Sequence, residues 1–176
     1  HTSPNEKKLG WLSHLLLRYL ASGKRLVTLY LYRDPRDAVL SGYEYGRRSI
    51  QMGKPNAFAE TFKTIEAGID WMDRYMRTSY PYWRYAPHTL QVRYEDLLTN
   101  FAAESTRILQ HLELDRQSEQ VQEIVQKYQA GAAPQVGTHF YKGEIGRFRQ
   151  EMTPEQLQLC EHAFARYLDG MGYSEG

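Results

Sequence analysis

The residues best suited to chemistry lie in the turn of residues 33–37, Arg-Asp-Pro-Arg-Asp, which follows an apolar run. Asp34 is of a type that caps helices, and Pro35 suits a first helical position, so a helix is predicted from there. Arg33 and Ser41 would then lie near a helix N-terminus. A planar guanidinium, a hydroxyl and free backbone N–H groups together suit a phosphate. The alternative interpretation of this turn is a cluster of surface charges.

Two further segments carry side chains suited to binding. Residues 140–149, FYKGEIGRFR, form a basic loop. In this loop Gly143 and Gly146 allow backbone to approach a ligand closely, and Lys142 adds a cation. Tyr94 follows a predicted strand, where its ring can stack on a base or its hydroxyl can donate. Taken singly, the loop also fits a flexible basic surface, and Tyr94 also fits a purely structural role.

Composition limits the classes of function. The chain has 176 residues and a net charge of +1, so no overall field points to nucleic acid or a membrane surface. We expect no metal, because the histidines and the single cysteine show no metal-ligand spacing. Cys160 falls on an apolar helical stripe and is predicted to fill the core. No apolar segment reaches about 20 residues, and we expect a cytoplasmic protein without a membrane partner.

The hydrophobic pattern predicts an α/β fold with a parallel sheet. Residues 25–33 form a continuous apolar strand, which is typical of a central strand covered on both faces. A second strand is predicted at 88–93, and helices lie between the two. Two strands make a small sheet, so we expect further strands, or a part of the sheet beyond this chain.

The helices are predicted from apolar periodicity and capping residues. One runs from Pro35 to Tyr45 and is followed by a loop from Gly46 to Pro55. An apolar stripe from Phe58 to Met76 predicts one continuous helix, and an aromatic loop covers 79–87. The remaining helices are predicted at 8–21, from Asn100 to Leu112, at 117–129, and after a capping box that begins at Thr153.

In this order, the three motifs resemble those of the sulfotransferases that use 3′-phosphoadenosine 5′-phosphosulfate (PAPS). The turn matches the family pattern [YF]-x-x-R-[DN]-P-[RK]-D-x-x-x-S as LYLYRDPRDAVLS. RYEDLLTNFAAESTRILQHLEL and FYKGEIGRFRQEMTPEQ are similar to the later segments. The similarity covers most of residues 25–160. Tyr141 departs from the family's Arg, and Arg147 with Phe148 replaces the family's Asp and Trp.

The resemblance implies a central parallel sheet flanked by helices, related to the P-loop nucleotide kinases. By position, Arg33 and Ser41 match residues that bind the 3′-phosphate of PAPS, and Tyr94 matches a residue near the adenine. Lys142 and Gly143 match the loop that closes over the same phosphate. The implied general base is a His before the strand, for which His1 is favoured and His14 is the alternative.

The resemblance also implies a reaction, in which a sulfuryl group passes from PAPS to a hydroxyl or amine acceptor and leaves 3′,5′-bisphosphoadenosine (PAP). The acceptor would be a small phenolic, lipid, polyketide-like or carbohydrate molecule. The family's 5′-phosphosulfate loop is not in the sequence, so we expect residues 1–176 to be a single sulfotransferase domain without its N-terminal strand and that loop. The alternatives are a non-catalytic PAP-binding module and a nucleotide kinase. A kinase would need a Walker loop, and GxxxxGK[ST] does not occur.

Overall fold

The computed structural model describes residues 27–84, 86–129 and 143–174, which fall into two compact units. The described residues of the first unit are 33–81 and 144–174. Those of the second unit are 27–32, 82–84, 86–129 and 143. The predicted helix at 8–21 lies outside the described residues.

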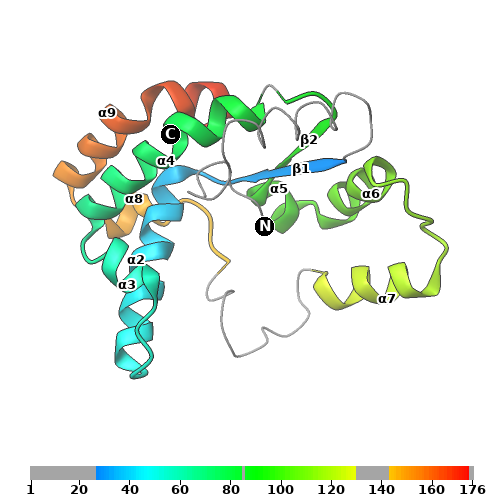
Figure 1. Cartoon of the computed structure of the whole chain (residues 1–176), viewed down its shortest axis with the longest axis horizontal. Coiled ribbons are helices and arrows are strands. Elements are labelled where there is room, and N and C mark those ends of the chain that lie inside the picture. Colours follow the sequence, from blue (N-terminus) through cyan, green and yellow to red (C-terminus); the bar gives the residue numbers. More distant parts are fainter. Residues whose placement is uncertain (1–26, 85, 130–142, 175–176) are drawn as a thin grey trace, which may run out of the picture. The chain divides into compact units, whose positions relative to one another are not determined.

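The second unit contains a two-stranded parallel sheet. Strand β1 (Thr28–Tyr32) lies beside β2 (Thr89–Arg93), with Thr28 opposite Thr89 and Tyr32 opposite Arg93 (Figure 1). The two threonine hydroxyls are 2.6 Å apart and can hydrogen bond across the pair. The α/β class and the parallel pairing predicted from the sequence are therefore confirmed.

Burial along β1 differs from the prediction of a strand covered on both faces. Exposure alternates along the strand, and Leu29 and Leu31 are 40% and 57% exposed. On the opposite face Tyr30 and Tyr32 stack with their ring centres 5.9 Å apart. The prediction was wrong because a run of apolar residues shows that both faces can be buried, but not that both are covered.

Three helices complete the described part of the second unit: α5 (Tyr94–Thr99), α6 (Phe101–His111) and α7 (Glu119–Tyr128). The helices predicted after Asn100 and at 117–129 are confirmed within two residues at each end. His111 on α6 contacts the carbonyl oxygen of Thr28 through Nε2 at 3.0 Å. Arg107 donates to the carbonyl of Gln91 at 2.7 Å. These contacts hold α6 against both strands.

The first unit is helical, and α2 (Pro35–Gln51) carries its candidate site. The predicted end at Tyr45 was wrong. Gly46 lies inside the helix, where an added Cβ would come within 2.8 Å of the carbonyl oxygen of Phe58. This glycine permits close packing of α3 (Ala57–Thr61) on α2 and does not end the helix.

The single helix predicted between Phe58 and Met76 is instead two helices. α3 ends at Thr61, and α4 (Ile65–Arg84) starts after Thr64, whose hydroxyl accepts from the backbone N–H of Ala67. Phe62 is 2% exposed at the break and packs against Gly42 and Gly68. Because α4 continues to Arg84 with Pro81 inside it, the prediction of an aromatic loop from residue 79 was also wrong.

The end of the first unit follows the prediction closely. α8 (Phe148–Glu151) precedes α9 (Pro154–Met171), and both hydrogen bonds of the predicted Thr153–Gln156 capping box are present. The apolar face of α9 is buried at Cys160, Phe164, Leu168 and Met171. Cys160 is fully buried, which confirms it as a core residue, and burial raises the pKa of its thiol to about 12.

Candidate functional site

The turn of residues 33–37 connects β1 to α2 as the sequence predicts. The side chain of Asp34 caps the helix by accepting from the backbone N–H of Arg36 at 2.9 Å, and Pro35 is the first helical residue. The seventeen-residue α2 therefore begins directly after this cap. Pro35 has no N–H, and the N–H groups of Arg36 and Ala38 are bonded to Asp34, so the helix favours an anion here through its dipole.

The turn is not a cluster of surface charges. Asp34 and Arg36 are each 5% exposed, and a guanidinium nitrogen of Arg36 lies 2.7 Å from a carboxylate oxygen of Asp34. Arg36 also donates to the carbonyl of Tyr173 at 3.2 Å, and its guanidinium lies 4.1 Å from the centre of the Phe148 ring. These buried contacts fix the backbone of the turn and leave Arg33 as its more accessible arginine.

The predicted pair, Arg33 and Ser41, is brought together. Arg33 donates from Nη1 to Oγ of Ser41 at 3.0 Å and from Nη2 to the carbonyl oxygen of Glu144 at 3.2 Å. The Arg33 side chain is 21% exposed. A guanidinium and a hydroxyl thus lie side by side at the start of a helix, which is a donor set that fits a phosphate. We call Arg33 and Ser41 the phosphate clamp.

Asp37 is a site residue that the sequence did not single out as such. Its Oδ2 accepts from the N–H of Gly146 at 2.6 Å, and its Oδ1 accepts from the N–H of Phe148 at 3.1 Å. Burial raises the pKa of the Asp37 carboxyl above its ordinary value, while the two backbone donors and Arg33 act in the opposite direction. The sequence showed only an acidic residue in a first helical turn.

A second contact holds the same segment to α2. Both guanidinium Nη atoms of Arg147 bond the Glu44 carboxylate, at 3.0 and 2.5 Å, and Arg147 also contacts Glu151 at 2.8 and 2.9 Å. These carboxylates raise the pKa of the Arg147 guanidinium, which is 8% exposed. The basic loop therefore has its second half fixed by ion pairs. Glu44 and Arg147 are 103 residues apart, so no local pattern predicts their pairing.

The other predicted site residues lie outside α2 or outside the described residues. Tyr94 is the first residue of α5 in the second unit and is partly buried. Gly143 has φ of 65° and Gly146 has φ of 76°, conformations that favour glycine, as expected for a tight loop. Lys142, His1 and His14 lie outside the described residues.

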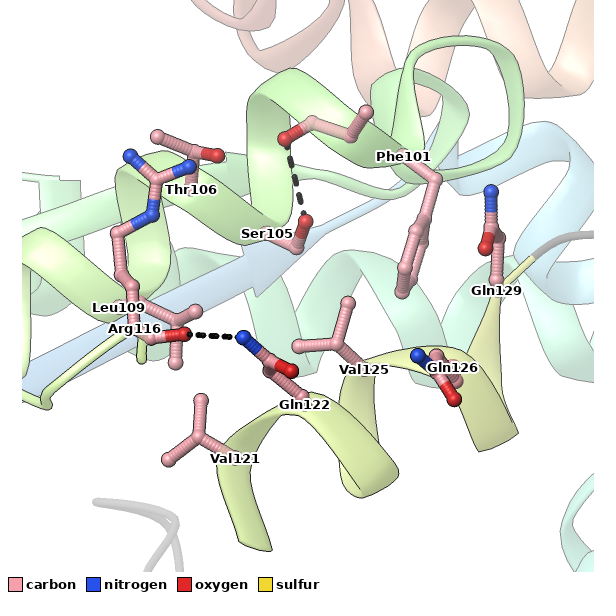
Figure 2. Close-up of a pocket in the computed structure, with 11 residues that line it drawn as sticks. Phe101, Ser105, Thr106, Leu109, Arg116, Val121, Gln122, Val125, Gln126 and Gln129 are labelled. Carbon is pink, nitrogen blue, oxygen red and sulfur yellow. Dashed lines mark hydrogen bonds between the residues drawn. The ribbon is translucent and has the colours of Figure 1, made fainter. Parts of the chain in front are cut away.

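A cavity of about 280 Å³ lies between α6 and α7 in the second unit. Figure 2 shows Phe101 and Val125 pointing toward one another across it, with glutamines at its rim. None of the predicted site residues lines this cavity. The surface that lines it is mainly apolar.

Neither a metal cluster nor a membrane span is found in the part of the chain that the structure describes. Those residues contain no group of three or more His, Cys, Asp or Glu side chains placed to hold a metal ion. Among the helices in the same residues, none is long and apolar enough to cross a membrane.

Comparison with known proteins shows the family of the chain. The model of the sulfotransferase domain family matches residues 4–172. A crystal structure of the mouse sulfotransferase SULT7A1 complexed with PAP is similar in fold, with a TM-score of 0.60 and 16% sequence identity. The match covers 86% of this chain and 61% of that chain. The matched region includes the turn, α2 and the segment that Asp37 holds, and the chain belongs to the sulfotransferase domain family.

Proposed function

We propose that this protein transfers a sulfuryl group from PAPS to a hydroxyl or amine of a small acceptor. Membership of the sulfotransferase family supports transfer of a sulfuryl group in general. The single observation that carries the choice of donor is the phosphate clamp, where Arg33 and Ser41 converge at the start of α2. In this proposal residues 1–176 belong to one sulfotransferase domain.

The clamp fits the 3′-phosphate that distinguishes PAPS and PAP from common adenine nucleotides. The guanidinium fork of Arg33 can bond two phosphate oxygens, and the hydroxyl of Ser41 can donate to a third. The PAP named with the SULT7A1 structure supports the same nucleotide for this chain. Lys142 and Gly143 are proposed to close over the phosphate, and Tyr94 is proposed to lie near the adenine.

The clamp would act at a distance from the reacting atoms. PAPS supplies the sulfuryl group, and binding of its 3′-phosphate by Arg33 and Ser41 would hold that group in place for in-line attack. His1, with His14 as the alternative, is proposed to remove the acceptor proton. A general base of this kind contributes about 10²–10⁴-fold to the rate. No metal is part of this proposal.

The acceptor is proposed from the remaining features of the chain. Its class is a small phenolic, lipid, polyketide-like or carbohydrate molecule. A net charge of +1 disfavours nucleic acid and strongly acidic polymers as partners. We propose a cytoplasmic protein that acts without a membrane partner.

Two measurements on the full chain test this function. Calorimetric titration should show binding of PAP and much weaker binding of ATP, because ATP lacks a 3′-phosphate. A transfer assay with PAPS and a panel of phenolic and sugar acceptors should then show formation of a sulfated product. Binding of PAP without transfer to any acceptor would favour the non-catalytic module, and preference for ATP would contradict the proposal.

A further inference from the structure

One carboxylate on α2 connects the phosphate clamp with a segment more than 100 residues later in the chain. The Asp37 side chain is 1% exposed, and each of its oxygens accepts from a different backbone N–H, of Gly146 and of Phe148. A buried carboxylate is costly unless it is hydrogen bonded, and these two donors offset that cost. The position of Asp37 therefore determines the position of the Gly146–Phe148 backbone.

The same carboxylate lies beside the arginine of the clamp. Oδ2 of Asp37 is 3.8 Å from Nη2 of Arg33, the atom that also donates to the carbonyl of Glu144. The position of the Arg33 guanidinium thus depends on Asp37 and on the Glu144 carbonyl. Glu144 lies two residues before Gly146, whose N–H donates to the same Asp37 carboxylate. Moving the segment would move the Glu144 carbonyl, and with it one of the contacts that aim the guanidinium.

The spacing on α2 shows why this arrangement forms. Asp37, Ser41 and Glu44 are four and three residues apart, so they lie on one face of the helix. Asp37 holds the backbone on either side of Arg147, and Glu44 holds the Arg147 side chain. Ser41 lies between them, and its hydroxyl accepts the hydrogen bond from Arg33. One helical face therefore carries both the contacts that fix the segment and a member of the clamp.

We propose that Asp37 is a positioning residue that fixes Arg33 and the segment Glu144–Phe148 relative to one another for binding of the 3′-phosphate. This inference rests on the proposed function, because it assumes that the clamp takes that phosphate. Asp37 itself does not contact the nucleotide. Its negative charge and its two acceptors act through Arg33 and through the backbone of the segment.

The test compares Asp37→Asn with Asp73→Asn by calorimetric titration with PAP and with 5′-AMP, which lacks the 3′-phosphate. The amide of Asn presents a donor to one of the two N–H groups, so the segment loses a partner. We expect the affinity for PAP to fall about 10-fold and the affinity for 5′-AMP to stay unchanged. Asp73 on α4 pairs with Arg77 at 2.7 Å, so its variant should leave both affinities unchanged.

The outcomes separate this inference from the proposed function. If the wild type does not bind PAP, the proposed function fails together with this inference. If it does, and Asp37→Asn binds PAP equally well or loses both ligands equally, the positioning role is overturned while the proposed function stands. If Asp37→Asn does not fold, hydrogen exchange in the wild type decides: the N–H groups of Gly146 and Phe148 should be protected without ligand, and rapid exchange would contradict the proposal.

Discussion

Arg33 and Ser41 lie eight residues apart and meet through a 3.0 Å hydrogen bond from Nη1 to Oγ. The contact follows from the helix start between them. Arg33 precedes the Asp34 cap, and Ser41 lies in the second turn of α2, on the face of the helix that the Arg33 side chain contacts. Residues eight apart in the sequence are therefore neighbours in the structure, and a guanidinium and a hydroxyl lie near the positive end of the helix dipole.

Replacing Arg33 by Lys should weaken PAP binding although the charge is kept. Lys carries a point charge and cannot present the planar fork that bonds two phosphate oxygens. We expect a loss of affinity of about 10-fold in calorimetric titration. The matched control is Arg47→Lys on the same helix, where the exposed arginine contacts Tyr43. Equal affinities for PAP in the wild type and the Arg33 variant would show that the Arg33 guanidinium does not bind the phosphate.

Ser41→Ala should have a smaller effect in the same direction. The substitution removes one neutral donor and the acceptor that holds Arg33, while an alanine suits the helix interior. We expect a loss of PAP affinity of about 3- to 10-fold, with the thermal midpoint little changed. A larger loss than that of Arg33→Lys would make Ser41, rather than the fork of Arg33, the main determinant of phosphate binding.

Glu44→Gln should destabilise the fold. The Glu44 side chain is 22% exposed and its Arg147 partner 8%, so the change leaves a largely buried guanidinium with weaker partners. We expect the free energy of unfolding in urea to fall by about 1–3 kcal/mol. Asp70→Asn breaks a pair whose side chains are both 64% exposed, and it should cost less than about 0.5 kcal/mol. Equal costs would show that the Arg147 contacts are not buried in solution.

The buried Cys160 thiol should make the free energy of unfolding depend on pH. Its pKa is raised by burial to about 12, above the ordinary 9.0 that the unfolded chain should show. The unfolded thiol therefore ionises first, and wild-type stability is lost as pH rises above 9. Relative to Cys160→Ala, the wild type should lose about 1.4 kcal/mol between pH 8 and 10, measured by urea unfolding. A constant difference would place the thiol in a water-accessible position.

Local chemistry made much of the fold predictable. The Asp34 cap, the Thr153–Gln156 capping box and the apolar stripe of α9 depend on residues within a few turns, and all are present. The errors came from residues whose partners are distant. Gly46 resembles a helix end, but it is required by the backbone of α3.

The contacts of the site also divide into local ones, which the sequence predicts, and distant ones, which it does not. The Arg33–Ser41 pair depends on one turn and one helix, so its spacing was sufficient to predict it. The contacts of Asp37 with Gly146 and Phe148 join segments more than 100 residues apart, and they depend on tertiary packing that one sequence does not encode as a pattern.

A crystal structure of the protein with PAP bound tests the central claim most directly. We expect oxygens of the 3′-phosphate within about 2.7–3.2 Å of the Arg33 guanidinium and the Ser41 hydroxyl, at the start of α2. A nucleotide bound elsewhere, with Arg33 still directed only to Ser41 and the Glu144 carbonyl, would contradict the phosphate clamp.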